Sequence, residues 1–336
     1  MITRHPNNPV LEPSQVPYPA DCVFNAGAAK INGDYLMVFR NDFDYRGGAA
    51  FGGCCLGLAR SSDGVDWTVD PEPIVTIEQA RQWFADSHHP RFGADEISRV
   101  YDPRITVLDD QIHLTVAMDT RHGILGAILR TDDFRRFELI SLSVPDNRNM
   151  VLFPERIGDR YYRLERPFSI YGRGAPEAFD LWSSSSPDLT HWGNSRLVLG
   201  SEEVPYANSK IGPAAPPIRT PAGWLAAIHA VHKDDDQLLN AWGDQQWTKA
   251  YHAGLALLDL DDPQRLIGIS RQPLLTPEPP YETDGFRGSV IFPCAMIAED
   301  SGEVKIYYGA ADTVVALASA DLDDLLSSIE PVPTAR

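Results

Sequence analysis

An aspartate stands between an aromatic residue and a proline in RVYDPRITVLDDQIHL, residues 99–114, immediately before an alternating apolar run. Asp-Pro is a common turn initiator, and the proline presets the backbone for an extended segment, so Asp102 can simply be a turn residue at a strand start. A carboxyl group held rigidly at such a place can also move a proton as a general acid. The stretch alone leaves both interpretations open, because motifs of this length often match by chance.

Cationic and aromatic residues occupy comparable places beside other apolar runs. They are Arg148 and Arg166 in NRNMVLFPERIGDRYYRLERP, Lys210 before Ile-Gly-Pro, His229 in AIHAVH, and Tyr251. Singly, they can be solvated arginines, a surface lysine or a core histidine. The chain has 29 Lys and Arg against 47 Asp and Glu and a net charge of −18, so neighbouring cations would be a local exception. Since guanidinium groups bind phosphate bidentately and lysine adds a point charge, together they predict a site for a small dianion.

A second set of residues follows the same placement in the first and last parts of the chain. It comprises Asn25 in VFNAGAA, Arg40 after YLMVF, Phe292 in IFPCAM and Asp312 in YYGAAD. Asn25 and Asp312 can also be read as turn caps. Their position, shared with the cationic residues, favours one common site over separate structural roles.

The composition argues against some classes of partner. An anionic surface disfavours binding to nucleic acid or to an anionic membrane. No stretch has the length and apolarity of a membrane span, and the opening residues, MITRHPNNPVLEP, lack the apolar core of a secretion signal. We therefore expect a cytoplasmic protein that acts on small molecules, and a homo-oligomer is a possible assembly.

The signals for metal binding are weak. The chain contains four cysteines, which are Cys22, Cys54, Cys55 and Cys294. They show neither metal-ligand spacing nor a redox pair separated by two residues, so we expect reduced core thiols. His88 and His89 are adjacent but lack a carboxylate framework. We therefore expect neither a metal nor an organic cofactor.

Short apolar or alternating runs dominate the chain, and long segments with helical periodicity are nearly absent, which indicates an all-β protein. One unit recurs at intervals of about 60 residues. It consists of an apolar strand, small or polar residues with an aspartate, a turn, and another apolar or aromatic residue. The units are LARSSDGVDW (58–67), AILRTDDFRRF (127–137), LWSSSSPDLTHW (181–192), LALLDLDDPQRLI (255–267) and VALASADLDDLL (315–326).

An upstream strand accompanies each unit. These strands are YLMVFR (35–40), IHLTVAM (112–118), RYYRLERP (160–167), WLAAIHAVH (224–232) and VKIYYGAAD (304–312). Blades of four strands that pack on their neighbours account for the recurrence, so we predict a single five-bladed β-propeller domain over residues 1–336. A pair of β-sandwich domains is the alternative. Residues 77–96 interrupt the pattern, with a short predicted helix in their first half, and are an insertion loop near the site.

In the order in which they occur, these motifs resemble glycoside hydrolase family 130, whose members are mostly β-mannoside phosphorylases on a five-bladed propeller. The resemblance spans nearly the whole chain. Its strongest segments are VYDPRI, VLFPERI with RLERP, KIG-x-x-x-PPI, LLDLDDP, and VIFPC with YYGAAD. The resemblance implies a phosphorylase of the glycosyltransferase class, with inorganic phosphate as co-substrate and no cofactor.

The resemblance also implies a role for each candidate residue. Asp102 corresponds to the family's sole catalytic acid. The residues that would hold the mannosyl unit are Asn25, Arg40, Phe292 and Asp312. The residues that would line the phosphate site are Arg148, Arg166, Lys210, His229 and Tyr251. Hydrolytic members of the family have lost the phosphate site, so its presence here favours phosphorolysis.

The implied reaction needs only one carboxylic acid. An inverting hydrolase uses two carboxyl groups, one of which activates water, whereas phosphate arrives already anionic. Phosphate would attack the anomeric carbon while Asp102 supplies a proton to the leaving oxygen through a hydroxyl of the mannosyl ring. Such a donor would need a raised pKa. The products would be α-mannose 1-phosphate and a shortened acceptor, in a reversible reaction.

Three alternatives stay open on the sequence. A β-mannoside hydrolase on the same fold would use two carboxylates and water. A furanosidase-type propeller would need a second aspartate near the first strand, for which Asp21 and Asp42 are loose candidates. A non-catalytic propeller would bind sugar without turnover. The linkage, β-1,2 or β-1,4, and the acceptor are not predicted, because Ala26, the 77–96 insertion and NDFDYRGG (41–48) depart from the family pattern.

Overall fold

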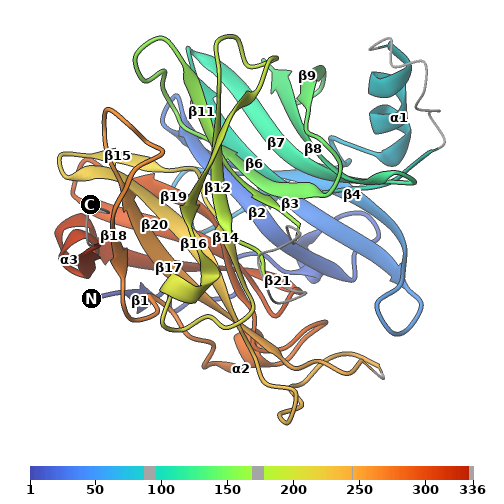
Figure 1. Ribbon diagram of the computed structural model, residues 1–336. Helices are drawn as coiled ribbons and strands as arrows, with labels where there is room; N and C mark the ends of the chain where they lie inside the picture. The colour runs from blue at the N-terminus through green and yellow to red at the C-terminus, as the bar shows by residue number, and fades with distance from the viewer. Residues whose placement is uncertain (87–95, 169–177, 244, 333–336) are drawn as a thin grey trace.

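The computed structural model describes residues 1–86, 96–168, 178–243 and 245–332. Five antiparallel sheets surround one centre (Figure 1). The strands nearest the centre contact their neighbours around it, β2 against β6 and β19, and β10 against β6 and β14. These inner strands are β2 (Cys22–Ile31), β6 (Ile97–Leu108), β10 (Asn147–Leu152), β14 (Lys210–Pro213) and β19 (Ile291–Ala298). The prediction of an all-β, five-bladed propeller is confirmed, and the pair of sandwiches is excluded.

The remaining strands of each blade follow outward from the inner strand. The second strands are β3 (Asp34–Tyr45), β7 (Gln111–Thr120), β11 (Tyr161–Pro167), β16 (Gly223–Lys233) and β20 (Glu303–Ala310). The third strands are β4 (Phe51–Ser61), β8 (Gly123–Thr131), β12 (Leu181–Ser186), β17 (Lys249–Leu258) and β21 (Val314–Asp321). The outer strands are β5 (Thr68–Val69), β9 (Glu138–Leu142), β13 (Gly193–Leu199), β18 (Leu266–Ser270) and β1 (Thr3–Arg4). The fourth sheet also contains β15 (Ile218–Thr220) and β22 (Ile329–Pro331).

The recurring sequence unit begins in the third strand of every blade, and each upstream segment lies in the second strand. In the first blade, Ser61 Oγ accepts a hydrogen bond from the Gly64 N–H (2.9 Å), and Asp63 Oδ1 accepts from those of Val65 (2.8 Å) and Asp66 (3.0 Å). The matching pairs in the second and third blades are Thr131 with Asp133 and Ser186 with Asp188. The unit recurs because its aspartate satisfies backbone donors that the turn would otherwise leave exposed.

Apolar faces are buried between neighbouring blades. One cluster includes Leu58 of the first blade and Leu114 of the second, and another includes Phe153 of the third and Trp224 of the fourth. Further clusters join the other neighbouring pairs. Each such side chain contributes about 1.5–3 kcal/mol when it is fully buried. A single blade would expose both of its faces, so the ring as a whole provides the stability.

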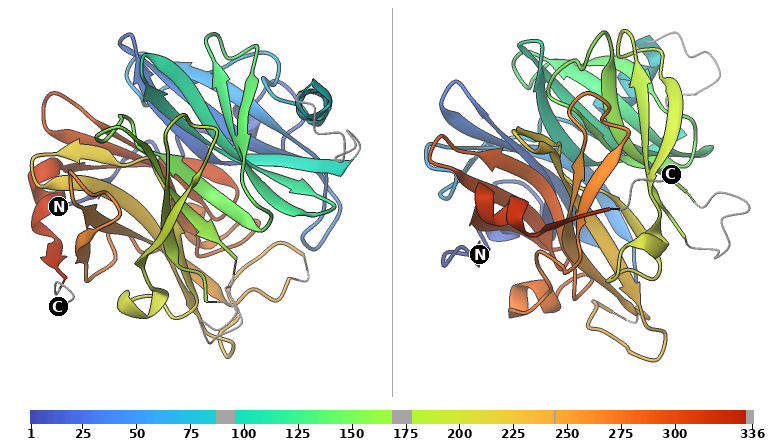
Figure 2. Two further views of the ribbon diagram at one scale, coloured as in Figure 1. Left: turned by 45° about the horizontal axis from the view of Figure 1, so that its top comes forward. Right: turned by 60° about the vertical axis from the view of Figure 1, so that its left-hand side comes forward.

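The first and last strands fasten the ring. β1 pairs with β21, with Thr3 opposite Ser319, and completes the fifth blade. The buried Glu282 of α2 (Pro280–Thr283) accepts hydrogen bonds from Arg4 Nε (2.8 Å) and Nη2 (2.9 Å). Figure 2 shows the N-terminal segment beside α3 (Leu322–Ser327), which follows β21. After α3, β22 pairs with β18 of the fourth blade. The two ends of the described chain therefore hold neighbouring blades together.

The insertion begins with α1 (Ile77–Asp86), which confirms the predicted short helix. α1 lies on the outer side of the ring beside the second blade (Figure 1). The ring of Trp83 lies 5.8 Å from that of Phe137 and anchors the helix there. Residues 87–95, which include His88 and His89, lie outside the described residues. The role of the insertion stays a prediction.

Candidate active site

The inner strands of the first three blades each contain a residue with a positive φ angle at a point where the strand pairing shifts. Asn25 (φ +48°), Asp102 (φ +55°) and Asn149 (φ +60°) lie in β2, β6 and β10, and the register shifts at all three places. Such a β-bulge re-aims a side chain, and Asn and Asp tolerate positive φ better than most residues. β6 begins at Ile97, so the expectation that Asp102 marks a strand start is wrong. It lies at a bulge within the strand.

Asp102 is held by the first blade. Its Oδ1 accepts hydrogen bonds from Asn25 Nδ2 (2.9 Å) and from Arg40 Nη1 (3.1 Å). Burial of Asp102 opposes ionisation, but the Arg40 and Arg104 guanidinium groups and the Asn25 hydrogen bond together lower its pKa below the ordinary value. The raised pKa expected for a general acid is therefore absent from the free site, and the carboxyl group is ionised there.

Asp312 supplies a second carboxyl group, near that of Asp102. It lies in the tight turn between β20 and β21, where Ala311 and Asp312 both have positive φ (+48° and +50°) and Thr313 N–H bonds to Ala310 O (2.9 Å). Its Oδ2 lies 3.8 Å from Arg287 Nη1. Burial raises the pKa of Asp312, against the influence of Arg287. The turn interpretation of Asp312 is thus correct, and the turn also delivers its carboxyl group to the site.

Arg148 and Arg166 lie directly opposite each other on β10 and β11. Within the described residues, no carboxylate lies at ion-pair distance from either guanidinium group. Each lies instead over an aromatic ring, Arg148 over Phe168 (5.4 Å) and Arg166 over Phe179 (5.2 Å). Burial and the neighbouring Arg148 lower the pKa of Arg166 to about 9, so it stays cationic at neutral pH. Two like charges in this position, that of Arg166 buried and that of Arg148 part-buried, favour an anion between or beside them.

His229, from β16, extends this cationic group. Its Nε2 lies 2.9 Å from Arg166 Nη1, which can only donate, so Nε2 accepts and the hydrogen resides on Nδ1. Burial, followed by Arg166 and Lys210, holds the pKa of His229 well below its ordinary value, so the ring is neutral. It stacks on Phe292 (4.5 Å) and on Tyr251 (6.2 Å). A neutral histidine here can donate a hydrogen bond to an anion.

Several buried polar atoms of this region have no hydrogen-bond partner among the described residues. They are Arg148 Nε, Asn149 Oδ1, Arg166 Nε, Ser209 Oγ and His229 Nδ1. Buried donors without a partner are costly, by about 1–3 kcal/mol each. Their concentration at one place indicates that this part of the ring is built to receive a polar ligand.

The structure brings the predicted site residues together in two adjoining groups. The first contains Asn25, Arg40, Asp102 and Asp312. The second contains Arg148, Arg166, Lys210, His229, Tyr251 and Phe292. Lys210 Nζ lies 5.4 Å from the Tyr251 ring. The residues of both groups lie in inner and second strands, except for Tyr251 of β17 and Asp312 of the β20–β21 turn.

Some residues of the site were missed. Asn149 repeats the bulge of Asn25 and Asp102, but its neighbour Arg148 drew attention instead. Arg104, almost fully buried, reaches across the centre so that its Nε bonds to Ala214 O, and it lies over Phe292 (5.4 Å). Its place two residues after Asp102 in DPR was the only available signal.

In the described part of the chain, no group of three or more His, Cys, Asp or Glu residues is arranged to hold a metal ion. The four cysteines are free and buried, as expected. Among the described helices, none has the length and apolarity needed to cross a membrane.

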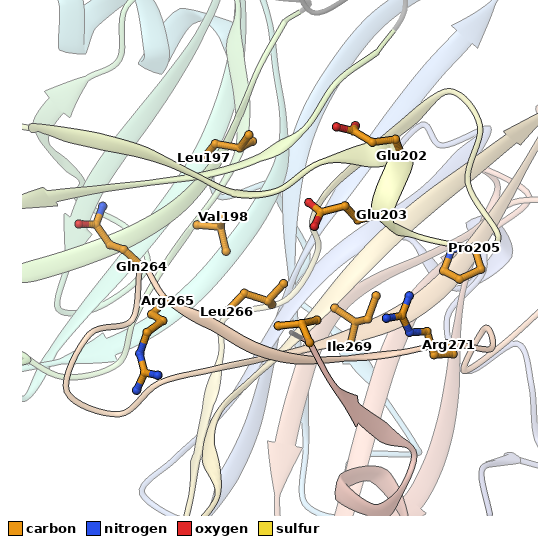
Figure 3. A pocket seen from close by; sticks show the side chains of 11 residues that line it. Leu197, Val198, Glu202, Glu203, Pro205, Gln264, Arg265, Leu266, Ile269 and Arg271 are labelled. Carbon is orange, nitrogen blue, oxygen red and sulfur yellow. The ribbon is translucent and has the colours of Figure 1, made fainter. Parts of the chain in front are cut away.

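A groove of about 750 Å³ lies between the outer strands of the third and fourth blades (Figure 3). Leu197, Leu266 and Ile269 provide apolar surface, and Glu203 and Arg271 carry charges at it. None of the predicted site residues lines it. The groove is therefore separate from the predicted site residues.

Comparisons with known proteins identify the family to which the chain is similar. The model of glycoside hydrolase family 130, described as beta-1,4-mannooligosaccharide phosphorylase, matches residues 3–330. The chain is 31% identical over 276 residues to the β-1,2-mannobiose phosphorylase of Listeria innocua, covering 82% of this chain and 68% of that one. It is 30% identical over 335 residues to the β-1,4-mannooligosaccharide phosphorylase of Ruminococcus albus, covering 98% and 91%.

A solved structure gives the same result for the fold. The Listeria innocua β-1,2-mannobiose phosphorylase, in complex with β-1,2-mannobiose, superposes with a TM-score of 0.79 at 26% identity, covering 97% of this chain and 98% of that one. The two named relatives differ in the linkage that their names state. The comparisons therefore give the family and the fold but no preference between the linkages.

Proposed function

This chain belongs to glycoside hydrolase family 130, and from that membership we propose that it is an inverting β-mannoside phosphorylase. It cleaves a β-mannosidic bond with inorganic phosphate and yields α-D-mannose 1-phosphate and a shortened acceptor sugar. The reaction transfers a mannosyl group to phosphate and not to water, and it needs no cofactor besides the co-substrate. We further propose that residues 1–336 act as one catalytic unit in the cytoplasm, where phosphate is abundant.

The opposed pair Arg148 and Arg166 is the observation that carries the proposal. The guanidinium group of Arg166 is buried and that of Arg148 is part-buried, and neither has a carboxylate partner in the described chain. The two would repel each other, and a phosphate dianion removes that repulsion. Lys210 and the neutral His229 add donors on the same side. A hydrolase that activates water with a carboxylate would have no use for such a group of cations.

The bond changes follow from the two adjoining groups of residues. A phosphate oxygen attacks the anomeric carbon, the bond from that carbon to the acceptor oxygen breaks, and that oxygen takes a proton. Asn25, Arg40 and Asp312 of the first group hold the mannosyl unit. Phe292 also contacts it, from its place beside His229 in the second group. The cationic group orients phosphate, so its contribution is positioning and electrostatic stabilisation. Inversion follows because phosphate enters on the face opposite the leaving oxygen.

Asp102 supplies the proton, through a mannosyl hydroxyl, once phosphate is bound. In the free site nearby cations, Arg148 among them, lower its pKa. The negative charge of phosphate offsets Arg148 and therefore raises the pKa of Asp102. The acid is thus prepared by the arrival of its co-substrate.

Release of inorganic phosphate tests the function directly. The purified protein is given α-mannose 1-phosphate with glucose, mannose, N-acetylglucosamine or a mannooligosaccharide as acceptor. Release with at least one acceptor is expected, with complete loss in Asp102→Asn and a loss of about 100-fold or more in Arg166→Ala. Arg163→Ala is the matched control, because Arg163 lies buried on the same strand but pairs with Glu165 (2.9 Å). It is expected to retain phosphate-dependent turnover.

Other outcomes would separate the alternatives. Cleavage of β-mannosides without phosphate, insensitive to Arg166→Ala, would overturn the proposal in favour of a hydrolase. Sugar binding without turnover, unchanged in Asp102→Asn, would instead identify a binding propeller.

A further inference from the structure

Asp42 is a fully buried carboxylate shared between two arginines. Its Oδ2 accepts hydrogen bonds from Arg40 Nη2 (2.6 Å) and from Arg99 Nη2 (2.8 Å), and both of its oxygens accept from Arg40 Nε (3.1 and 3.2 Å). Its side chain is 0% exposed, whereas that of Arg99 is 32% exposed. The carboxylate thus joins a residue of the site to a residue that solvent reaches.

This arrangement determines which edge of Arg40 faces the site. Asp42 occupies the Nε and Nη2 edge, which leaves Nη1 to bond to Asp102 Oδ1 at 3.1 Å. The guanidinium group is also held over the rings of Phe24 (4.3 Å) and Tyr101 (4.9 Å). Because the guanidinium plane is rigid, fixing one edge fixes the other.

The charges around Asp102 come from several elements. The cations are Arg40 of β3, Arg104 of β6, Arg148 of β10 and Arg166 of β11. The other carboxyl groups are Asp42 of β3 and Asp312 of the β20–β21 turn, and Tyr101 and Cys294 also lie nearby. Of these, Arg40 is the cation that contacts Asp102 directly. The charge of its other partner therefore bears on Asp102.

We propose that Asp42 is a positioning residue, which aims Arg40 at Asp102 and offsets its charge, and that Arg99 tunes this offset by sharing Asp42. The inference rests on the proposed function, in which Asp102 must gain and give up a proton. Asp42 itself touches neither substrate in this scheme. It acts through Arg40.

Two substitutions act in opposite directions. Asp42→Asn keeps the shape but leaves Asp102 as the only carboxylate that contacts Arg40 in the described chain. The pKa of Asp102 therefore falls, and the alkaline limb of the kcat–pH profile moves to lower pH. Arg99→Gln leaves the charge of Asp42 to Arg40 alone, so the limb moves to higher pH. A displacement of about one unit would reduce kcat of Asp42→Asn roughly tenfold at the pH where wild type begins to decline. Opposite shifts from two neighbouring residues are not expected of a merely structural role.

Glu282→Gln is the matched control. Glu282 is also fully buried and bonds to an arginine through Nε and Nη2, but it lies at the ring closure and contacts Arg4. It is expected to lose stability as Asp42→Asn does, without any displacement of the pH profile. Arg99→Gln changes a part-exposed residue, so it keeps the inference testable if Asp42→Asn fails to fold.

A measurement without turnover separates this inference from the proposed function. Sulfate is titrated into the full-length protein in two buffers of different ionisation heat, and the difference gives the protons taken up. Wild type is expected to take up protons, because sulfate offsets Arg148 and raises the pKa of Asp102. At a fixed pH, Asp42→Asn takes up fewer protons, Arg99→Gln takes up more, and Asp102→Asn takes up none.

The two readouts distinguish the failures. If no acceptor gives turnover but proton uptake follows this order, the proposed function is wrong and the role of Asp42 stands. If turnover is present but Asp42→Asn and Arg99→Gln leave both the profile and the uptake unchanged, or shift them in the same direction, the role of Asp42 is overturned.

Discussion

Arg148 and Arg166 are direct cross-strand partners, one part-buried and one buried cation at a single register position of β10 and β11. Directly opposed like charges destabilise a sheet, and burial adds to the penalty. The third blade therefore carries strain that an anion relieves. From the proposed phosphate site we expect stability and phosphate binding to be linked at this position, and the link can be measured.

Arg166→Gln is expected to stabilise the phosphate-free protein while it abolishes efficient phosphorolysis. Removal of one opposed cation relieves the repulsion and the burial of charge, which we expect to raise Tm by roughly 2 °C, equivalent to about 1 kcal/mol. Turnover should fall by about 100-fold or more, because a preorganised donor is lost. Thermal unfolding with and without phosphate checks this. A lower Tm than wild type in phosphate-free buffer would contradict the strain.

The architecture could be predicted from the sequence because its signal is local and repeated. Asp63, Asp133 and Asp188 each follow a third strand and accept hydrogen bonds from the next backbone N–H groups. The same turn therefore produces the same sequence pattern in each blade. The contact of β1 with β21 could not be read in this way. Two residues, Thr3 and Arg4, carry no periodicity, and their partner lies at the far end of the chain.

The site was predictable by residue type but not by geometry. Arg148, Arg166 and His229 lie together as expected. The amino-acid sequence alone, however, does not predict that Asp102 lies at a bulge within β6 or that its pKa is lowered. The lowered pKa of Asp102 depends on Arg40, which lies on β3, and on Arg104, which lies on β6 and reaches across the centre. Contacts between strands determine this pKa, and those contacts cannot be derived from a single sequence.

Gly212→Ala should disturb the phosphate half of the site. A Cβ there would lie 2.6 Å from His229 Cε1 and 2.7 Å from Arg166 Cδ, so both side chains must shift. We expect KM for phosphate to rise by about tenfold or more, as for other small displacements of positioned groups. Gly193→Ala is the control, because its Cβ would meet nothing within 4 Å. An unchanged KM for phosphate in Gly212→Ala would show that the His229–Arg166 pair is not needed in this geometry.

Gly309→Ala should disturb the sugar half instead. Its Cβ would lie 2.4 Å from Asn25 Oδ1 and 2.9 Å from Asn25 N. Displacement of Asn25 would remove the hydrogen bond that Asn25 Nδ2 donates to Asp102 Oδ1. We expect kcat/KM for the sugar substrate to fall by about tenfold or more while the stabilisation of the protein by phosphate is retained. Calorimetry with phosphate and steady-state kinetics check the two halves separately. If Gly309→Ala and Gly212→Ala had the same effects, the division of the site into two groups would be wrong.

The turn aspartates predict how stability depends on pH. Hydrogen bonds from the Asp66 and Val65 N–H groups lower the pKa of Asp63 to about 2, and backbone donors likewise lower those of Asp133 and Asp188. A lowered folded-state pKa gives stability that is present above the unfolded value, about 3.9, and is lost as pH falls through the folded value. Stability should therefore decline from about pH 4 toward pH 2.

Asp63→Asn provides the check. Urea unfolding at pH 7 should show a less stable variant than wild type, and the difference should shrink steadily below about pH 4. Asp66→Asn, in the same exposed turn, is the control. A difference between Asp63→Asn and wild type that stayed constant from pH 7 to pH 2 would contradict the assignment.

The closure of the ring also constrains when the protein can fold. Thr3 is made long before its partner Ser319. Earlier blades can assemble as they emerge, but the fifth has no outer strand until β21 has been made and β1 pairs with it. Until then the N-terminal segment must wait without its partner. Chains whose synthesis stops early would therefore present an open ring to the quality-control machinery of the cell.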